Sequence, residues 1–282
     1  MGKIKIIFDS TVYIDGEVLK KHNVGVASLN VIEGDNSYKE SEVEVPFIFS
    51  EQDKGKSWTT SQPAPGEFLN LYEDALKEGY DKIFVLGLSR NISGTYQSAL
   101  LAKNMLKNPE SVYLFDTMLC AYGTEMIGVE LLELVNNKLP EEEIISRINT
   151  LIANSQQMFT VENLFALVKG GRLTLAKAAI GTVLRLKPVI RVVDGKLKNV
   201  HSERTYKKLH RYFINEMKKT TEGHKKLYVY ITSHFSDDSS EAVKALIETE
   251  FPNAKITYTK YLGPVFSIHV GRKGYGISWC YE

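Results

Sequence analysis

Residues 82–99 read KIFVLGLSRNISGTYQSA, an apolar run that ends in a turn and continues into a helical pattern. The apolar part, residues 82–88, has the length and the residue types of a buried strand. The turn contains serine, asparagine and glycine, and the pattern that follows it predicts a helix through Lys107. A strand that leads directly into a helix is the building unit of parallel sheets, so this stretch predicts an α/β fold.

The same alternation extends in both directions through the first half of the chain. Strands separated by helical crossovers form a mainly parallel sheet whose two faces are covered. Pro65 suits the first turn of a helix, because the N–H that proline lacks would be unpaired there. We expect strands at 3–8, 24–32, 82–88 and 112–115, and helices from Pro65, after Gly94, and over 124–136 and 140–155.

The second half has a different pattern. Asp194-Gly195 separates two apolar runs and suits the two positive-φ positions of a tight hairpin turn. We therefore expect two domains, an N-terminal α/β domain over 1–156 and a C-terminal α+β domain over 157–282. The elements expected in the second domain are helices at 164–169, 173–186, 205 onward and 239–251, and strands at 188–193, 196–200, 227–232, 256–261 and 265–270.

Composition excludes several classes of protein. Of the 282 residues, 43% are hydrophobic and 24% are charged, which is typical of a globular chain. The apolar runs stop short of the roughly 20 residues that span a bilayer, so we do not expect an integral membrane protein. Cys120 and Cys280 lie far apart and have no partner at metal-ligand spacing. This pattern favours a reducing cytoplasm, with neither a disulfide framework nor a metal site.

Three hydroxyl-rich segments follow predicted strands and precede helices: 9–11, 59–62 and 89–95. Helix N-termini carry free N–H groups and a partial positive charge, so such loops favour carboxylate or phosphate. Serine and threonine are also common helix caps, and for one loop taken alone capping is the simpler interpretation. The three segments together favour an anion site.

Familiar catalytic and cofactor signatures are absent. The chain has no GxxxxGK[ST], GxGxxG, GxSxG or HExxH, so the sequence supports neither a nucleotide or dinucleotide cofactor nor a zinc-dependent or elbow-type hydrolase.

Six short segments in a fixed order carry a resemblance over essentially the whole chain. They are Asp9-Ser10-Thr11; Thr60-Ser61-Gln62-Pro63; Ser93-Gly94-Thr95-Tyr96-Gln97-Ser98-Ala99; Gly170-Gly171-Arg172; Lys187-Pro188 with Asp194-Gly195 and Arg204; and His269-Val270-Gly271. With these segments the sequence resembles the DegV family. The resemblance implies a bacterial lipid-binding protein of two α/β domains that buries one long-chain fatty acid between or within them.

The resemblance also implies how such a protein works. Family members of this kind serve in bacterial fatty acid kinase, as carriers that present the bound carboxylate to a separate ATP-using subunit that makes acyl phosphate. It implies no catalytic residue, no metal and no cofactor besides the bound fatty acid. It places the carboxylate contacts on Thr60, Ser61, Ser93, Gly94 and His269. It places Arg204 and Arg172 nearby or facing the kinase partner.

A buried carboxylate must be hydrogen-bonded or paired, and hydroxyls, helix N–H groups and an imidazole meet that need. Residues that could line a tunnel for the acyl chain are apolar and fall near the same segments, although each could equally be ordinary core. They are Ile92, Leu164, Leu167, Ile180, Leu184 and Phe266.

Two other functions stay open on the sequence. Ser93 and His269 could act as nucleophile and base of an acyl-hydrolase or acyltransferase, since such a pair needs geometry and not sequence order. The second half, with 21 Lys+Arg against 11 Asp+Glu over 156–282, could instead bind nucleic acid, although we expect no nucleic-acid partner. The cations concerned are Arg204, Lys207, Lys208, Arg211, Lys218, Lys219, Lys225 and Lys226.

Overall fold

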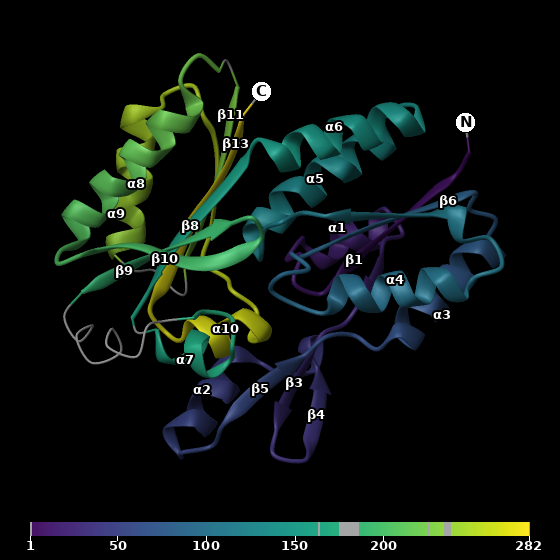
Figure 1. Cartoon of the computed structure of the whole chain (residues 1–282), viewed down its shortest axis with the longest axis horizontal. Coiled ribbons are helices and arrows are strands. Elements are labelled where there is room, and N and C mark those ends of the chain that lie inside the picture. The colour runs from purple at the N-terminus through teal and green to yellow at the C-terminus, as the bar shows by residue number, and fades with distance from the viewer. Residues whose placement is uncertain (1, 163, 175–185, 225, 234–237, 282) are drawn as a thin grey trace. The chain divides into compact units, whose positions relative to one another are not determined.

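The computed structural model describes residues 2–162, 164–174, 186–224, 226–233 and 238–281 (Figure 1). Its contacts divide the chain into two compact units. Unit 1 comprises Met1–Ile152 together with Gly263–Val265, and unit 2 comprises Ala153–Leu262 together with Phe266–Glu282. The domain limits expected from the sequence, 1–156 and 157–282, stay a prediction.

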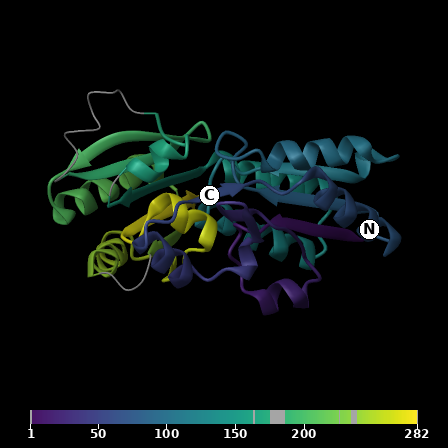
Figure 2. The same cartoon turned by 90° about the horizontal axis from the view of Figure 1, so that it is seen from below.

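Unit 1 is built on a four-stranded parallel sheet in the order β2-β1-β6-β7. The strands are β1 (Ile4–Asp9), β2 (Gly25–Ala27), β6 (Lys82–Gly87) and β7 (Val112–Asp116). Each neighbouring pair is parallel, as the alternation of strand and helix predicts. Figure 2 shows β1 as the purple strand that begins at the N-terminus.

Helices cover both faces of this sheet. In Figure 1, α3 (Pro65–Lys77) and α4 (Thr95–Met105) lie on one face, and α5 (Tyr122–Asn136) lies on the other, followed by α6 (Glu141–Ala153). Pro65 occupies the first turn of α3, where its missing N–H is not needed. The short α1 (Gly16–Lys21) connects β1 to β2. The core between the sheet and α3 and α4 includes Ile7, Phe68, Tyr72, Ile83, Ala99 and Ala102.

A second, antiparallel sheet of unit 1 corrects two expectations. Its order is β4-β3-β5, formed by β3 (Asn30–Glu33), β4 (Asn36–Lys39) and β5 (Trp58–Ser61), with α2 (Val45–Asp53) between β4 and β5. The single strand expected over 24–32 is two strands, because the chain leaves one sheet after Ala27 and enters the other at Asn30. The segment expected to be a loop at 59–62 mostly forms β5, since pairing with β3 satisfies its backbone.

Unit 2 contains a six-stranded sheet in the order β10-β9-β8-β13-β11-β12. All of its pairs are antiparallel except β11–β12, which is parallel. This mixed sheet agrees with the expected α+β class. The strands are β8 (Ser155–Val161), β9 (Lys187–Val193), β10 (Lys196–Glu203), β11 (Leu227–Ser233), β12 (Lys255–Thr259) and β13 (Gly274–Tyr281).

Two long helices, α8 (Tyr206–Thr221) and α9 (Asp238–Glu250), lie on one face of this sheet (Figure 1). Their core includes Leu209, Phe213, Met217, Val243, Ile247 and Trp279. The hairpin predicted at Asp194-Gly195 is confirmed, with φ of 51° and 71° at the two turn residues. Thr205 caps α8 and accepts a hydrogen bond from Lys208 N at 3.3 Å.

Unit 2 differs from the sequence-based expectation in its short apolar segments and in its two central strands. Residues 265–270, expected to be a strand, belong to α10 (Pro264–Val270), because Pro264 starts a helix and a short, mostly apolar segment fits either structure. The two central strands β8 and β13 were not predicted, and β13 contains two glycines that obscure its alternation. The short helix expected at 164–169 is α7 (Phe165–Lys169), but most of the helix expected over 173–186 lies outside the described residues.

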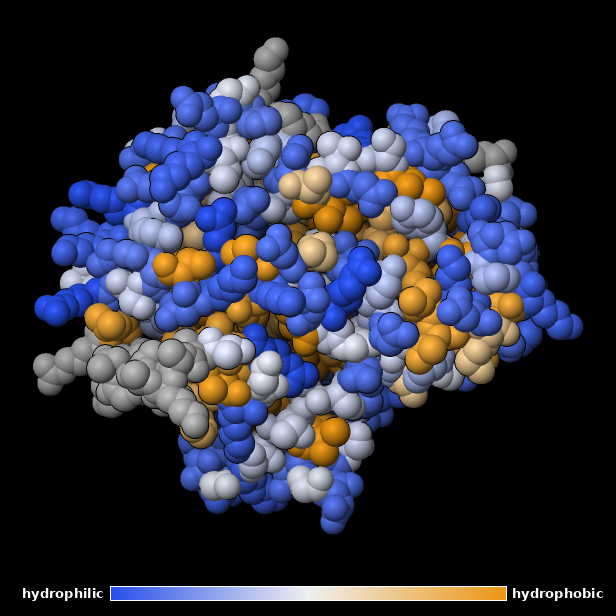
Figure 3. Space-filling model, in the orientation of Figure 1, coloured by the Kyte–Doolittle hydropathy of each residue, from blue (hydrophilic) through white to orange (hydrophobic). Residues whose placement is uncertain are grey.

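The face drawn in Figure 3 is mostly hydrophilic, with apolar surface over α4, where Leu101 and Met105 are exposed. No helix in the described part of the chain has both the length and the apolar character that a membrane crossing requires.

Candidate anion-binding site

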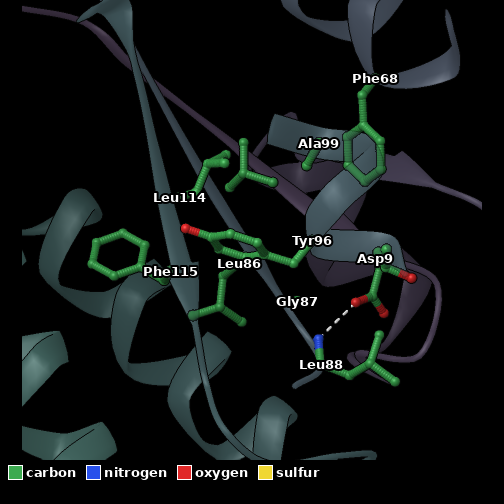
Figure 4. A pocket seen from close by; sticks show the side chains of 11 residues that line it. Asp9, Phe68, Leu86, Gly87, Leu88, Tyr96, Ala99, Leu114 and Phe115 are labelled. Atoms are coloured by element: carbon green, nitrogen blue, oxygen red, sulfur yellow. Dashed lines mark hydrogen bonds between the residues drawn. The ribbon is translucent and has the colours of Figure 1, made fainter. Parts of the chain in front are cut away.

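The loop after β1 is fastened by the carboxylate of Asp9. This group accepts hydrogen bonds from the N–H and the hydroxyl of Thr11, at 2.8 and 2.5 Å, and from Leu88 N at 2.8 Å. The last bond, drawn in Figure 4, ties the ends of β1 and β6 together. Asp9 is buried, and burial raises its pKa above the ordinary value. Asp9 and Thr11 therefore hold the loops at the carboxyl edge of the sheet.

Ser10 of the same loop also has its hydroxyl engaged within the protein. Its Oγ donates to Glu40 Oε2 at 2.5 Å and accepts from Leu29 N at 3.0 Å. The hydroxyls of the first predicted anion-binding segment are thus used internally. The loop 9–11 supports the structure around the candidate site.

Ser93 stands where the sequence predicts it, in the loop that starts α4. Its Oγ lies 2.9 Å from Thr95 Oγ1 and accepts from Thr95 N at 3.3 Å, while its own N–H donates to Ser89 O at 3.1 Å. Gly94 is the residue that caps α4. Ser93 is half-buried, and its hydroxyl makes a local turn contact.

Thr60 and Ser61 are the last two residues of strand β5, so they do not lie in a loop that starts a helix. The Ser61 hydroxyl accepts from Asn30 Nδ2 at 3.4 Å. Gln62, the next residue, packs on the start of α4, because a Cβ placed on Gly94 would lie 3.0 Å from Gln62 Cδ and Nε2. The structure therefore brings the 60–62 and 93–94 segments together within unit 1.

Gln62 is a further candidate site residue, beyond those predicted from the sequence. Its carboxamide occupies the space that the missing side chain of Gly94 leaves open. The signal available in the sequence was its place between two predicted ligand residues and Pro63. An amide there offers two N–H donors beside the N-terminus of α4.

In unit 2, His269 of α10 packs against the Gly170-Gly171-Arg172 segment. A Cβ on Gly170 would lie 2.9 Å from His269 Nδ1, so only glycine leaves room for the imidazole. Burial, assisted by the positive charge of Arg172, lowers the pKa of His269 to about 4. The imidazole is therefore neutral near pH 7 and can donate one N–H to an anion.

The two arginines of the prediction differ in environment. Arg172 is half-buried, its Nη1 donates to Gly170 O at 2.6 Å, and burial lowers its pKa. Arg204 is exposed at the junction of β10 and α8. Arg172 is thus held beside His269, whereas Arg204 presents its charge to solvent.

The residues predicted to line the acyl chain fall into three groups. Leu164, Leu167 and Phe266 are buried in unit 2. Ile92 is half-buried in unit 1. Ile180 and Leu184 lie outside the described residues.

The pocket in Figure 4 is a small one within unit 1, beside the loop that Asp9 fastens. The ring of Tyr96 lies among Leu86, Leu114 and Phe115, and the pocket has room for about one water molecule. It is therefore too small for an acyl chain. Its lining is Asp9, Phe68, Val85, Leu86, Gly87, Leu88, Thr95, Tyr96, Ala99, Leu114 and Phe115.

Two glutamates of unit 1 with raised pKa values, Glu40 and the half-buried Glu125, were not anticipated. Burial raises the pKa of Glu40 and of Glu125 to about 7. Glu125, in the first turn of α5, has a buried Oε2 with no hydrogen-bond partner among the described residues. Glu40 is fully engaged and accepts from Ser10, Tyr13 and Val265.

Comparison with known proteins identifies the family. The family model described as "Uncharacterised protein, DegV family" matches residues 3–282. A DegV domain-containing protein of Halalkalibacterium halodurans is 30% identical over 285 residues, which cover 100% of both chains.

Two solved structures are similar over nearly the whole length. A fatty-acid-binding DegV family protein from Thermus thermophilus is 28% identical with a TM-score of 0.89, covering 99% of this chain and 100% of that one. DegV from Bacillus subtilis, described as a fatty acid binding protein, is 26% identical with a TM-score of 0.85, covering 100% of both. The ordered motifs, the two folded units and these matches agree, and the chain belongs to the DegV family.

Proposed function

We propose that this protein binds one long-chain fatty acid and acts as a carrier. The observation that supports this most directly is the full-length similarity, in sequence and fold, to two DegV proteins that bind fatty acids. The ordered motif set of the sequence points to the same ligand.

The carboxylate contacts in this proposal are Thr60, Ser61, Ser93, Gly94 and His269. Within unit 1, the segments that carry the first four lie against each other at the start of α4, where free helix N–H groups favour an anion. Within unit 2, His269 is neutral near pH 7 and can donate an N–H, with the charge of Arg172 beside it. These donors are of the kind that keeps a carboxylate ionised once it leaves water.

The acyl chain supplies most of the affinity in this proposal. Each buried CH₂ contributes about 0.8 kcal/mol, so a chain of fatty-acid length can bind tightly without further polar contacts. We propose Ile92, Leu164, Leu167 and Phe266 as residues that contact the chain, together with Ile180 and Leu184 outside the described residues.

We further propose that the carboxylate is presented to a separate ATP-using kinase subunit, which makes the acyl phosphate. Two features support this role. The sequence contains neither the phosphate-loop motif nor the dinucleotide-binding motif, so the phosphate donor has no recognised site on this chain. Arg204 is exposed and available to an acidic partner surface.

The first experiment asks what the purified protein carries. Denaturing extraction followed by mass spectrometry should release intact fatty acid at about one molecule per chain. Stripped protein should then bind added palmitate or oleate. Recovery of no fatty acid, together with no binding of either, would overturn the carrier function.

The second experiment separates the carrier from a serine acyl-hydrolase. A carrier releases its ligand intact and does not turn over an activated ester. A covalent acyl adduct on Ser93, with ester turnover that Ser93→Ala abolishes, would replace the carrier function by a hydrolase. For the kinase role, acyl phosphate should form from ATP only when a partner subunit is added.

A further inference from the structure

Glu40 is a buried carboxyl group that the proposed ligand contacts do not use. It lies directly after β4, at the start of a short 3-10 helix over Glu40–Glu42, and is only 4% exposed. Its Oε2 accepts from Ser10 Oγ, and its Oε1 accepts from Tyr13 OH at 2.9 Å and from Val265 N at 3.0 Å. One carboxyl group thus connects the loop that contains Ser10 and Tyr13 with Val265, which is far away in the sequence.

The segment Gly263–Val265 belongs to unit 1 by its contacts although the chain around it belongs to unit 2. A second contact holds it in the same place. A Cβ on Gly263 would lie 2.3 Å from Tyr13 Cε1, so the glycine backbone rests directly on the Tyr13 ring. The hydroxyl of that same ring donates to Glu40. Glu40 and Tyr13 therefore hold residues 263–265 in place.

These contacts of Glu40 and Tyr13 lie at the first turn of α10, the helix that carries His269. The N–H of Val265 is one of the first four in the helix, which have no partner inside it. Val265 and His269 are four residues apart, so they lie on the same side of the helix, about 6 Å apart along its axis. The hydrogen bond at Val265 N therefore fixes the direction in which α10 points the imidazole of His269.

We propose that Glu40 is a positioning residue: its carboxyl group anchors Val265 N and thereby places His269 against Gly170. The proposal rests on the proposed function only in that His269 is the ligand contact being placed. In this proposal Glu40 acts through α10 and is not itself a ligand contact.

The groups around Glu40 explain why a carboxyl group is needed. Its contacts are all donors: two hydroxyls and one backbone N–H. The other charge that acts on it is the Asp9 carboxylate. An apolar side chain of the same volume would leave Val265 N and both hydroxyls without this acceptor, whereas glutamine would keep one oxygen for Val265.

The test compares Glu40→Met, which removes both acceptor oxygens at similar volume, with Glu40→Gln, which keeps one. Glu51→Met is the matched control, since Glu51 is a buried glutamate of the same unit whose partners are Lys54 and Lys56. The primary measurement is an NMR titration of the His269 ring in fatty-acid-free protein, with the signal assigned by its loss in His269→Asn. The second measurement is oleate affinity.

In Glu40→Met the pKa of His269 should rise from about 4 toward its ordinary 6.5, because an imidazole that is no longer held against Gly170 regains contact with water. Oleate affinity should fall about tenfold, the effect of one lost hydrogen bond. Glu40→Gln should stay close to the unmodified protein in both measurements, and Glu51→Met should leave the His269 pKa unchanged. The amide of Val265 should exchange with solvent faster only in Glu40→Met.

An unchanged His269 pKa in folded Glu40→Met, or an equal change in Glu51→Met, would overturn the proposal. If Glu40→Met does not fold, Glu40→Asp carries the same test, because its carboxylate ends about 1.5 Å short of Val265 N. The titration uses no ligand. Failure of the unmodified protein to bind oleate would therefore count against the proposed function and leave the result on positioning intact.

Discussion

Ser93 has two roles available to its hydroxyl, a turn contact with Thr95 and a contact with the ligand. Ser93→Ala should lower fatty-acid affinity by about 1.5–3 kcal/mol if the hydroxyl donates to a carboxylate. If it only supports the start of α4, the change should cost about 1 kcal/mol of folding stability and little affinity. The denaturant midpoint of ligand-free protein and the oleate affinity distinguish the two roles.

Thr205→Ala is the matched control for Ser93, because Thr205 caps α8 through Lys208 N and lies outside the proposed ligand contacts. It should lose about 1 kcal/mol of stability and no affinity. A Ser93→Ala protein that behaves like Thr205→Ala would make Ser93 a cap and would remove it from the carboxylate site.

The raised pKa of Glu40 predicts how the stability of the folded protein depends on pH. Burial raises this pKa from 4.5 to about 7 in the folded protein, so between these values the folded state keeps a proton that the unfolded state has released. The proton bound to Glu40 stabilises the folded state fully below pH 4.5, and this stabilisation is lost as pH rises through 7. Glutamine cannot ionise. The free energy of unfolding of the unmodified protein, relative to Glu40→Gln, should therefore fall by about 3 kcal/mol over this range.

Urea unfolding at a series of pH values measures this difference. A difference between the two proteins that does not change from pH 4.5 to 7.5 would mean that Glu40 titrates normally in the folded state.

The sequence allowed some of these residues to be identified and concealed others. Ser93 and Gly94 could be predicted because a strand, a turn and a helix follow one another locally. Glu40 could not, because it is one of three glutamates at alternating positions, with Glu42 and Glu44, in a stretch that resembles a solvated surface. Only the tertiary fold shows that the first of the three carboxylates is buried.

At the scale of elements, the repeated strand and helix units of unit 1 were predictable, since their hydrophobic periods are clear. The pairing of β3 with β5 in a separate sheet was not, because it joins residues 25 to 31 positions apart. Helix α10 and strand β13 show the same limit. Short apolar runs and glycine-containing strands fit several structures until their neighbours are known.

Helix α3 offers a paired test of these local rules. Gly79 follows its C-terminal end at φ of 77°, where a side chain has open space but a strained backbone. Gly79→Ala should therefore cost about 1 kcal/mol of stability. Gly66 lies in the first turn of the same helix, also in open space, and Gly66→Ala should stabilise the protein by about 0.5–1 kcal/mol. Thermal or urea unfolding that gave both changes the same sign would contradict this account.

For the whole molecule, two buried groups oppose each other as pH changes. The pKa of His269 is lowered from 6.5 to about 4, so the unfolded state takes up a proton first as pH falls, and stability decreases from pH 6.5 toward 4. Glu40 contributes the opposite slope between 4.5 and 7. His269→Asn should therefore steepen the decline of stability with rising pH between 4.5 and 6.5. Parallel pH profiles of variant and parent would refute this.

Ligand removal should also be visible in the whole molecule. A ligand that binds only the folded state stabilises it by about 2.7 kcal/mol at a free concentration of 100 times Kd. Stripped protein should melt earlier than protein loaded with oleate, by an amount that grows with the logarithm of oleate concentration. Glucose at the same concentration serves as the control and should have no effect.

The return of Gly263–Val265 to unit 1 has a consequence for synthesis on the ribosome. Unit 1 consists almost entirely of residues up to Ile152, yet the donor of one hydrogen bond to Glu40 is residue 265. Chains fold from the N-terminus as they are made. The nascent unit 1 must therefore wait, with this carboxyl group incompletely bonded, until residue 265 has left the exit tunnel.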